Sequence, residues 1–427
     1  MNLPASDLDL PSDEPCLKRV PPSPEPTPDA RAVRHESPPP SSSLIGTSSH
    51  AWCSSIAGPP LYAQKGGLLD RGTLVVPLTY PRSQDPVQPG CSSIDERLVA
   101  KISWQPSNQL PEDITLRLIQ RKIPTDWSKH VTDLKCSMSL RSDELGLPRK
   151  KIVALVEEDR RDGTCSEGEA KFREALRVDR TLDRVLRVLV CSRYSPLNQV
   201  KDAEEFKTVF KDVVKLHYVI YRKTGILHRD LSVSNIMFFR CSGRVIGVLN
   251  DWDLAAPEAR PSSRTSEQRI GTAVYMAMDL LDNPDGSVQY QYCYDLESFA
   301  WILLWCAFVL GFDGDEVRLD ELPERIQTWT AGNYWEAIRD AKSMFLCTKI
   351  GKNLEHITTS MKSLKKCWIA PVLRSMMINI FHRGMQETRY GPIEGDFFEF
   401  EAFMKVSEPE VEFPERAVCG DEDSTST

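Results

Sequence analysis

Residues 228–237 of this 427-residue chain read HRDLSVSNIM, and the rest of the sequence is interpreted outward from this stretch. Before it, residues 203–223 carry apolar residues with a period of 3.6 and are followed by Gly225, as in an amphipathic helix with a glycine C-cap. After it comes a β-type run, RVIGVLNDWD, at 244–253. A loop between helix and strand therefore presents Asp230 and Asn235 together. A carboxylate there can orient a hydroxyl proton, and an amide oxygen can bind a divalent cation.

The β-type run ends in two further carboxylates, Asp251 and Asp253. A carboxylate at the end of a strand can hold magnesium that bridges phosphate oxygens. A pair of aspartates in a turn is the structural alternative.

The first half of the chain contains short β-type runs, GTLVVPLTY at 72–80 and ERLVAKISW at 96–104. Residues 111–123 follow, with a proline and acids before apolar residues at helical spacing, which predicts a helix. Lys101 lies in the second run, and Glu112 begins the helix. Strand-like runs at 150–156 and 185–191 flank a polar segment, about 157–180, that is expected to be an insertion.

Downstream, YDLES at 294–298 leads into FAWILLWCAFVL at 299–310, the most apolar stretch of the chain. It is shorter than the ~20 residues that a membrane span needs, so a helix buried in a large domain is expected. Because an unpaired buried charge is costly, Asp295 next to this helix predicts a hydrogen-bonded carboxylate.

Composition excludes several classes of protein. The net charge of −8 argues against a nucleic-acid binder. The twelve cysteines are scattered and form no CxxC pair, which indicates thiols in a reducing compartment rather than zinc or disulfides. No signal peptide or membrane segment is predicted, so an intracellular protein, cytoplasmic or nuclear, is expected.

The order of strands followed by helices predicts an α+β protein. We expect a disordered Pro/Ser-rich tail at 1–60, a small sheet lobe at 61–195, a larger helical lobe at 196–405 and a disordered acidic tail at 406–427.

The segments LVAKISW, HRDLSVSNIM, GVLNDWDLA, GTAVYMAMDLL and YDLESFAWILL, in this order, resemble the fungal-type protein kinase family. The resemblance covers about residues 65–405. It implies a bilobal protein-kinase-like fold, the use of ATP with Mg²⁺, and Ser/Thr protein kinase activity on protein substrates.

The resemblance also implies roles for single residues. Asp230 would be the catalytic base, Asn235, Asp251 and Asp253 would hold magnesium, and Thr272 would contact the catalytic aspartate. Lys101 would bind the α- and β-phosphates, with Glu112 fixing its position. Asp295 would hydrogen-bond the backbone of the catalytic loop.

Three features depart from the kinase pattern. No G-x-G-x-x-G loop is present, and Gly72 with Thr73 in DRGTLVV is the best substitute. Ser232 stands where most Ser/Thr kinases carry a lysine, and DWD replaces DFG. These features leave two alternatives open, namely a small-molecule kinase of the aminoglycoside or choline type and a pseudokinase scaffold. The sequence leaves the substrate and the oligomeric state undetermined.

Overall fold

The computed structural model describes residues 55–63, 72–79, 97–141, 144–146, 184–258, 273–283, 287–312, 319–330, 335–386 and 403–405. The chain divides into Met1–Trp52, of which no residue is described, and Cys53–Thr427, which contains all the elements below.

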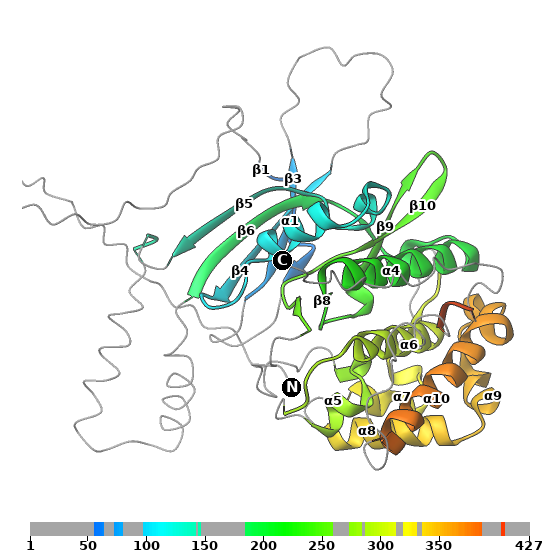
Figure 1. The fold of residues 1–427 in the computed structure, drawn as a ribbon. Helices are drawn as coiled ribbons and strands as arrows, with labels where there is room; N and C mark the ends of the chain where they lie inside the picture. Colours follow the sequence, from blue (N-terminus) through cyan, green and yellow to red (C-terminus); the bar gives the residue numbers. More distant parts are fainter. Residues whose placement is uncertain are drawn as a thin grey trace, which may run out of the picture. The chain divides into compact units, whose positions relative to one another are not determined.

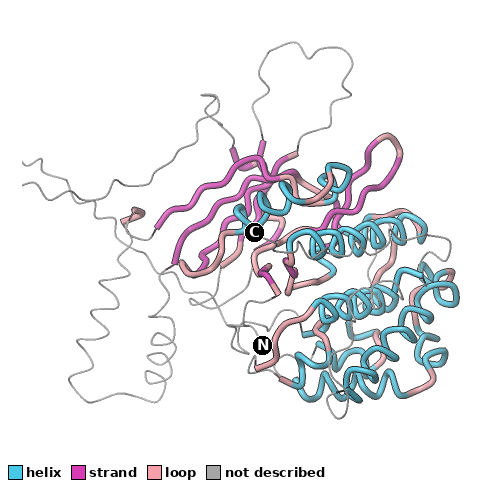
Figure 2. Tube along the Cα trace, viewed as in Figure 1, coloured by secondary structure: helices cyan, strands magenta, loops and turns pink. Residues whose placement is uncertain are grey.

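Strands predominate in the first part of the described chain and helices in the last part, with the helices Glu112–Lys122 and Ala203–Thr224 lying between strands (Figures 1 and 2). The strands are β1 (Ser55–Ile56), β2 (Tyr62–Ala63), β3 (Leu74–Thr79), β4 (Leu98–Pro106), β5 (Leu134–Arg141), β6 (Arg184–Ser192), β7 (Ser195–Pro196), β8 (Ile226–Leu227), β9 (Ile236–Cys241), β10 (Arg244–Leu249) and β11 (Ala256–Pro257). The α-helices are α1 (Glu112–Lys122), α4 (Ala203–Thr224), α5 (Met278–Asp282), α6 (Tyr292–Val309), α7 (Glu324–Gln327), α8 (Trp335–Cys347), α9 (Ile350–Asn353) and α10 (Ala370–Gln386). Shorter helical turns include η1 (Thr125–His130), η3 (Leu197–Gln199), η4 (Val233–Asn235), η6 (Ala273–Tyr275), η7 (Leu319–Glu321), η8 (Thr328–Thr330), η9 (Leu354–His356), η10 (Thr359–Met361) and the π-helical η11 (Lys365–Ile369).

An antiparallel sheet forms the first part of the fold. Its strand order is β1-β3-β4-β6-β5, with β2 also paired to β3. In the register of β3 and β4, Val75 lies opposite Lys101. Alternate residues of β6 are buried, as expected for a strand with one face on a core. The sheet therefore places Lys101 on a central strand whose two neighbours hold it rigidly.

Several sequence expectations about this sheet need correction or lie outside the described residues. The tail predicted over 1–60 extends too far, because β1 pairs with Leu78 and Thr79 of β3. Strand β5 (LKCSMSLR) was not predicted, because its polar residues obscure the β pattern. Among the described strands it pairs with β6 alone, at the edge of the sheet. The short strand β9 was missed as well. The strand expected at 150–156 and the insertion at 157–180 lie outside the described residues.

Helix α4 has clear stop and start signals at both ends. The carboxylate of Asp202 accepts hydrogen bonds from the backbone amides of Glu204 and Glu205 at the N-terminus. At the other end Gly225 adopts the left-handed conformation with φ 66°, as the sequence predicted. The apolar stripe of the helix is buried, and Phe210 packs edge-on against Phe299 and Trp368.

Helix α6 is the centre of the helical part, and all of its residues are buried. Among the described helices it is the one long and apolar enough to cross a membrane, but 94% of that segment is buried inside the protein. A helix that is apolar on all sides belongs in the core of a large domain. The helix begins at Tyr292, earlier than the apolar run, so it includes Asp295 and Glu297 in its buried first turns.

The α+β class is confirmed, with a small antiparallel sheet and α1 followed by a larger, mainly helical part.

Candidate active site

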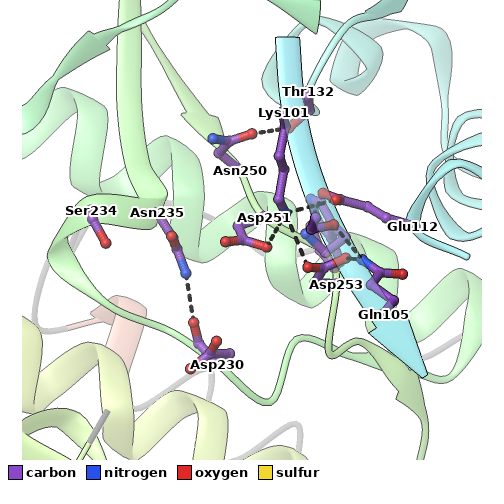
Figure 3. Close-up of polar contacts among 12 residues, drawn as sticks. Lys101, Gln105, Glu112, Thr132, Asp230, Ser234, Asn235, Asn250, Asp251 and Asp253 are labelled. Carbon is purple, nitrogen blue, oxygen red and sulfur yellow. Dashed lines mark hydrogen bonds and ion pairs between the residues drawn. The ribbon is translucent and has the colours of Figure 1, made fainter. Parts of the chain in front are cut away.

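Lys101 of β4 lies at the centre of a cluster of carboxylates (Figure 3). Its Nζ is 2.7 Å from Glu112 Oε2 and 2.6 Å from Asp251 Oδ1. A third carboxylate, Asp253, places Oδ2 at 3.3 Å. Lys101 and Glu112 are nearly buried, whereas the Asp251 side chain is 33% exposed. The cluster therefore has one solvent-facing member, Asp251.

Glu112 connects α1 to the segment that follows β10. Its Oε2 accepts from Lys101, and its Oε1 accepts a hydrogen bond of 2.9 Å from the backbone amide of Trp252. The helix begins at Glu112 because Pro111 precedes it with extended backbone geometry. The neighbouring Asp113 instead accepts from the Ser137 hydroxyl of β5 at 2.8 Å. Helix α1 thus directs its two adjacent acids to different partners.

Asp253 is buried beneath this cluster. Its carboxylate accepts a hydrogen bond from the Gln105 amide, and its backbone carbonyl accepts one from Gln109. Gln105 lies on the same face of β4 as Lys101 because the two are an even number of residues apart. The Asp253 side chain is 3% exposed and faces Lys101 Nζ. It therefore helps to hold Lys101 in place.

The cluster brings three acids to a single base, and the pKa values reflect this imbalance. Burial acts to lower the pKa of Lys101, but Asp251, Asp253 and Glu112 outweigh it and raise that pKa. Lys101 is therefore protonated. Burial raises the pKa of Glu112 to about 8, against the opposite effect of Lys101, and the charges of Asp253 and Asp251 add to the increase. Further positive charge brought to Asp251 would relieve this excess of carboxylates.

Asp295 of α6 forms hydrogen bonds with the backbone of the loop that carries Asp230. The Asp295 carboxylate accepts hydrogen bonds from the backbone amides of His228 (2.8 Å) and Arg229 (3.1 Å). It also accepts from the Tyr290 hydroxyl at 2.7 Å and contacts His217 Nε2 at 2.8 Å. Arg229 has φ 65°, a conformation that costs a non-glycine residue about 1–3 kcal/mol. The buried carboxylate stabilises this unusual backbone.

His228 links that loop to the segment carrying Asp251. Its Nδ1 accepts from the Asp230 amide (3.4 Å), so the proton lies on Nε2, which donates to the Asn250 carbonyl at 3.0 Å. Burial lowers the pKa of His228 in spite of the nearby Asp295 carboxylate, which keeps the ring neutral. The indole of Trp252 packs on the ring with centroids 4.8 Å apart. Asp230 and Asp251 therefore share one rigid support.

Asn235 closes the loop on itself. Its Nδ2 donates to the backbone carbonyl of Asp230 at 2.7 Å, which leaves the amide oxygen as the group able to bind a cation. In Figure 3 the Asp251 carboxylate lies between Lys101 on one side and Asn235 on the other. Asp251 has φ 62°, a second strained position beside the site.

The donor set fits a hard divalent cation. Glu112, Asp251 and Asp253 each offer a carboxylate oxygen, and these oxygens lie within 4.8 Å of one another. Carboxylate and amide oxygens are the ligands that Mg²⁺ prefers. Asp251 is the more accessible of the three, since Glu112 and Asp253 are engaged by Lys101, Trp252 and Gln105.

Comparison with known proteins agrees with this geometry. A sequence profile described as fungal protein kinase matches residues 64–307, which is more than half of the chain. The chain belongs to the fungal protein kinase family. Among solved structures it is similar to the kinase PK-1 of the Cydia pomonella granulovirus, with 12% sequence identity and a TM-score of 0.38, covering 76% of this chain and 88% of that chain. At that score the family match, rather than this likeness, supports a kinase fold and a phosphotransferase.

In this member of the fungal protein kinase family, the structure brings Lys101, Glu112, Asp251 and Asp253 into contact and places Asp230 and Asn235 on one loop. Gly72 and Thr73 come directly before β3, the neighbour of the Lys101 strand, and Gly72 has φ 56°. Their contact with phosphate remains a prediction. Thr272 lies outside the described residues.

Sequence reasoning missed Gln105, Gln109, Thr132 and Asn250. The Thr132 hydroxyl donates to Asn250 Oδ1 at 2.8 Å and so fixes the residue before Asp251. Gln105 could have been found from its even spacing to Lys101 on β4. Gln109 and Thr132 carry no such signal, because each lies in a connection whose course depends on the packing of other elements.

Proposed function

We propose that this chain is an ATP-dependent protein kinase that transfers the γ-phosphate to Ser or Thr hydroxyls of a protein substrate. Asp230 is its catalytic base, and Asn235 and Asp251 hold Mg²⁺. The observation that carries the proposal is that Lys101 forms ion pairs with both Glu112 and Asp251. The neighbouring loop holds Asp230 and Asn235 together through the hydrogen bond from the Asn235 amide to the Asp230 carbonyl. These groups need little rearrangement to act together.

The nucleotide has a suitable surface next to Lys101. Val99 lies on the same face of β4, and Val75 is opposite Lys101 on β3. Both valines are only partly buried, so they offer an apolar surface to a flat base. The Lys101 ammonium would then contact phosphate oxygens, which would take the place of the Asp251 carboxylate as its partner.

Asp230 and its neighbours supply the acid–base chemistry. The carboxylate of Asp230 accepts the proton of the acceptor hydroxyl as the hydroxyl oxygen forms the new bond to the γ-phosphorus. The bond between the γ-phosphorus and the oxygen that bridges it to the β-phosphate breaks in the same transfer, and ADP leaves. The Asp230 backbone is held by Asn235 and His228, which keeps the carboxylate oriented. Mg²⁺, when bound, neutralises charge on the phosphates. Lys101 adds a fixed positive charge from the other side.

A protein acceptor is favoured over a small molecule by the position of Asp253. An extra carboxylate would suit a small cationic acceptor if it faced the acceptor. The Asp253 carboxylate is instead buried and bound by Gln105 and Lys101, so it is engaged in holding the lysine.

The test is incubation of purified protein with labelled ATP and magnesium, followed by mass spectrometry of the labelled residues. We expect phosphate on Ser or Thr, and a loss of at least ~100-fold in rate for Asp230→Asn, since general-base catalysis contributes on this order. Asp126→Asn, at an exposed position in η1, is the matched control and is expected to act like the wild type.

Hydrolysis of ATP without labelled protein would favour a small-molecule kinase. If ATP is neither bound nor hydrolysed, the catalytic proposal is wrong and a scaffold becomes the better account.

A further inference from the structure

Lys342 of α8 is completely buried in the helical part, away from the Lys101 cluster. Its Nζ lies 4.5 Å from the centre of the Trp301 ring and 6.0 Å from that of Trp329. The two indoles meet edge to face, with centroids 5.4 Å apart. An ammonium over aromatic faces is attracted by their negative π surface.

This burial is unfavourable for a charged amine. Burial lowers the pKa of Lys342 to about 7, with only the charge of Glu297 acting to raise it. Within the part of the chain that the structure describes, no carboxylate forms an ion pair with Lys342. A buried lysine without an ion pair is rare, and a methionine of similar volume would avoid the desolvation. Stability of the core therefore does not explain why a lysine occupies this position.

The contacts of the amine indicate what it does. Nζ donates to the carbonyl of Met276 at 2.8 Å and to that of Ala273 at 3.4 Å. These carbonyls belong to η6 and the turn after it, which lead into α5. Ala273 directly follows Thr272, the residue expected to contact Asp230 at the acceptor site. Lys342 thus binds, from the protein interior, the backbone that begins one residue after Thr272.

We propose that Lys342 is a positioning residue for the phosphate acceptor: its ammonium, between Trp301 and Trp329, holds the Ala273–Met276 backbone in the shape that receives the substrate hydroxyl. This inference rests on the proposed function, because it assigns the 273–276 segment to the acceptor rather than to ATP. It predicts that replacing Lys342 raises the KM for the peptide acceptor and leaves the KM for ATP almost unchanged.

The test compares wild type with Lys342→Met, using a degenerate peptide mixture with a fixed central Ser or Thr as acceptor. We expect the KM for peptide to rise about tenfold or more, while the KM for ATP stays within about twofold, since Lys342 contacts no residue of the Lys101 cluster. Hydrogen exchange at the amides of 273–282 is expected to become faster in the variant.

Two further variants provide controls. Arg339→Met removes an exposed cation from the same helix, where Arg339 pairs with Asp282 of α5 at 2.7 Å, and is expected to leave the peptide KM unchanged. Trp329→Phe reduces the aromatic face without removing a hydrogen bond, because Trp329 Nε1 has no hydrogen-bond partner among the residues that the structure describes. It should raise the peptide KM in the same direction by a smaller factor, and it serves if Lys342→Met does not fold.

The outcomes separate the two proposals. If the wild type phosphorylates the peptides and both Lys342→Met and Trp329→Phe keep its peptide KM, the inference about Lys342 is wrong while the kinase stands. If the wild type transfers phosphate to no peptide, the proposed function has failed, and the acceptor role of Lys342 fails with it.

Discussion

At the scale of single residues, Lys101 shows how one positive charge organises several negative ones. It contacts Glu112, Asp251 and Asp253, which come from α1 and from the segment after β10. Removing one partner of a buried ion pair leaves the other uncompensated, and this is more costly than the net value of the pair. Changes in this cluster are therefore expected to affect activity strongly.

Glu112 and Asp113 allow a matched test of this cluster. Glu112→Gln keeps the shape of the side chain but replaces one of the two oxygens that accept from Lys101 and from the Trp252 amide with an NH2 donor, so kcat/KM for ATP is expected to fall about 10- to 100-fold. Asp113→Asn changes the adjacent acid, which bonds Ser137 instead, and should alter kcat/KM by less than about threefold. Steady-state kinetics on both variants measures this, and equal effects would contradict the assigned ion pair.

At the scale of elements, β4 shows that buried functional residues of a strand can have the sequence pattern of a solvent-facing row. Lys101, Ser103 and Gln105 alternate with Ile102 and Trp104, which looks like a polar face turned to water. In the fold, Ser103 and Gln105 are fully buried on that face. Polar residues in a strand can thus mark an internal site when a helix and a loop cover them.

Strand β10 and α4 meet at Gly247, where the backbone approaches the helix closely. The Gly247 amide donates to Asp212 Oδ2 at 3.0 Å, and its carbonyl lies 2.8 Å from His130 Nδ1. A Cβ at this position would overlap the Val209 carbonyl and lie 2.9 Å from Asp212 Cβ. Only glycine lets β10 lie this close to α4.

Gly247→Ala is accordingly expected to lower the free energy of unfolding by about 1–3 kcal/mol through overpacking. Gly384→Ala is the matched control, because Gly384 is exposed in α10 and a Cβ there meets no atom of the described residues within 4 Å. That substitution should leave stability unchanged or raise it by up to about 1 kcal/mol through helix propensity. Urea unfolding of both variants measures these changes in free energy. A Gly247→Ala variant as stable as the wild type would show that β10 and α4 can move apart to accept the added methyl group.

At the scale of the whole molecule, Asp295 of α6 connects the core of the helical part to the loop of Asp230. Burial acts to raise the pKa of Asp295, but the hydrogen bond and charge of His217, with the hydrogen bond from Tyr290, outweigh it and lower that pKa. The carboxylate is therefore ionised in the core. Stability and loop geometry depend on the same group.

Asp295→Asn is expected to lower the free energy of unfolding at pH 7 by about 3–5 kcal/mol and to reduce phosphotransfer, because an amide cannot replace both carboxylate oxygens as acceptors. A lowered folded-state pKa adds stability above the unfolded value, near ~4, and that stability is lost as pH falls through the folded value. The deficit of the variant should therefore narrow as pH falls from 7 towards 3. Denaturant titrations across this range test it, and a deficit independent of pH would contradict the argument.

The sequence by itself determined the fold class and the local features that carry the chemistry. The Asp230–Asn235 loop, the Asp251 strand end, the α4 helix with its Gly225 cap and the buried helix around 299–310 are encoded within short segments. Their roles in catalysis remain predictions, but their positions follow from spacing and periodicity, which are local properties.

The tertiary structure alone decided which partner each of these residues meets. It pairs Asp113 with Ser137, buries Asp253 against Gln105, and encloses Lys342 between two indoles with its amine bonded to the Met276 carbonyl. The physical reason is that periodicity tells which side chains share a face of an element, whereas the surface that packs on that face comes from residues far away in the chain. Such contacts are set by packing over the whole domain.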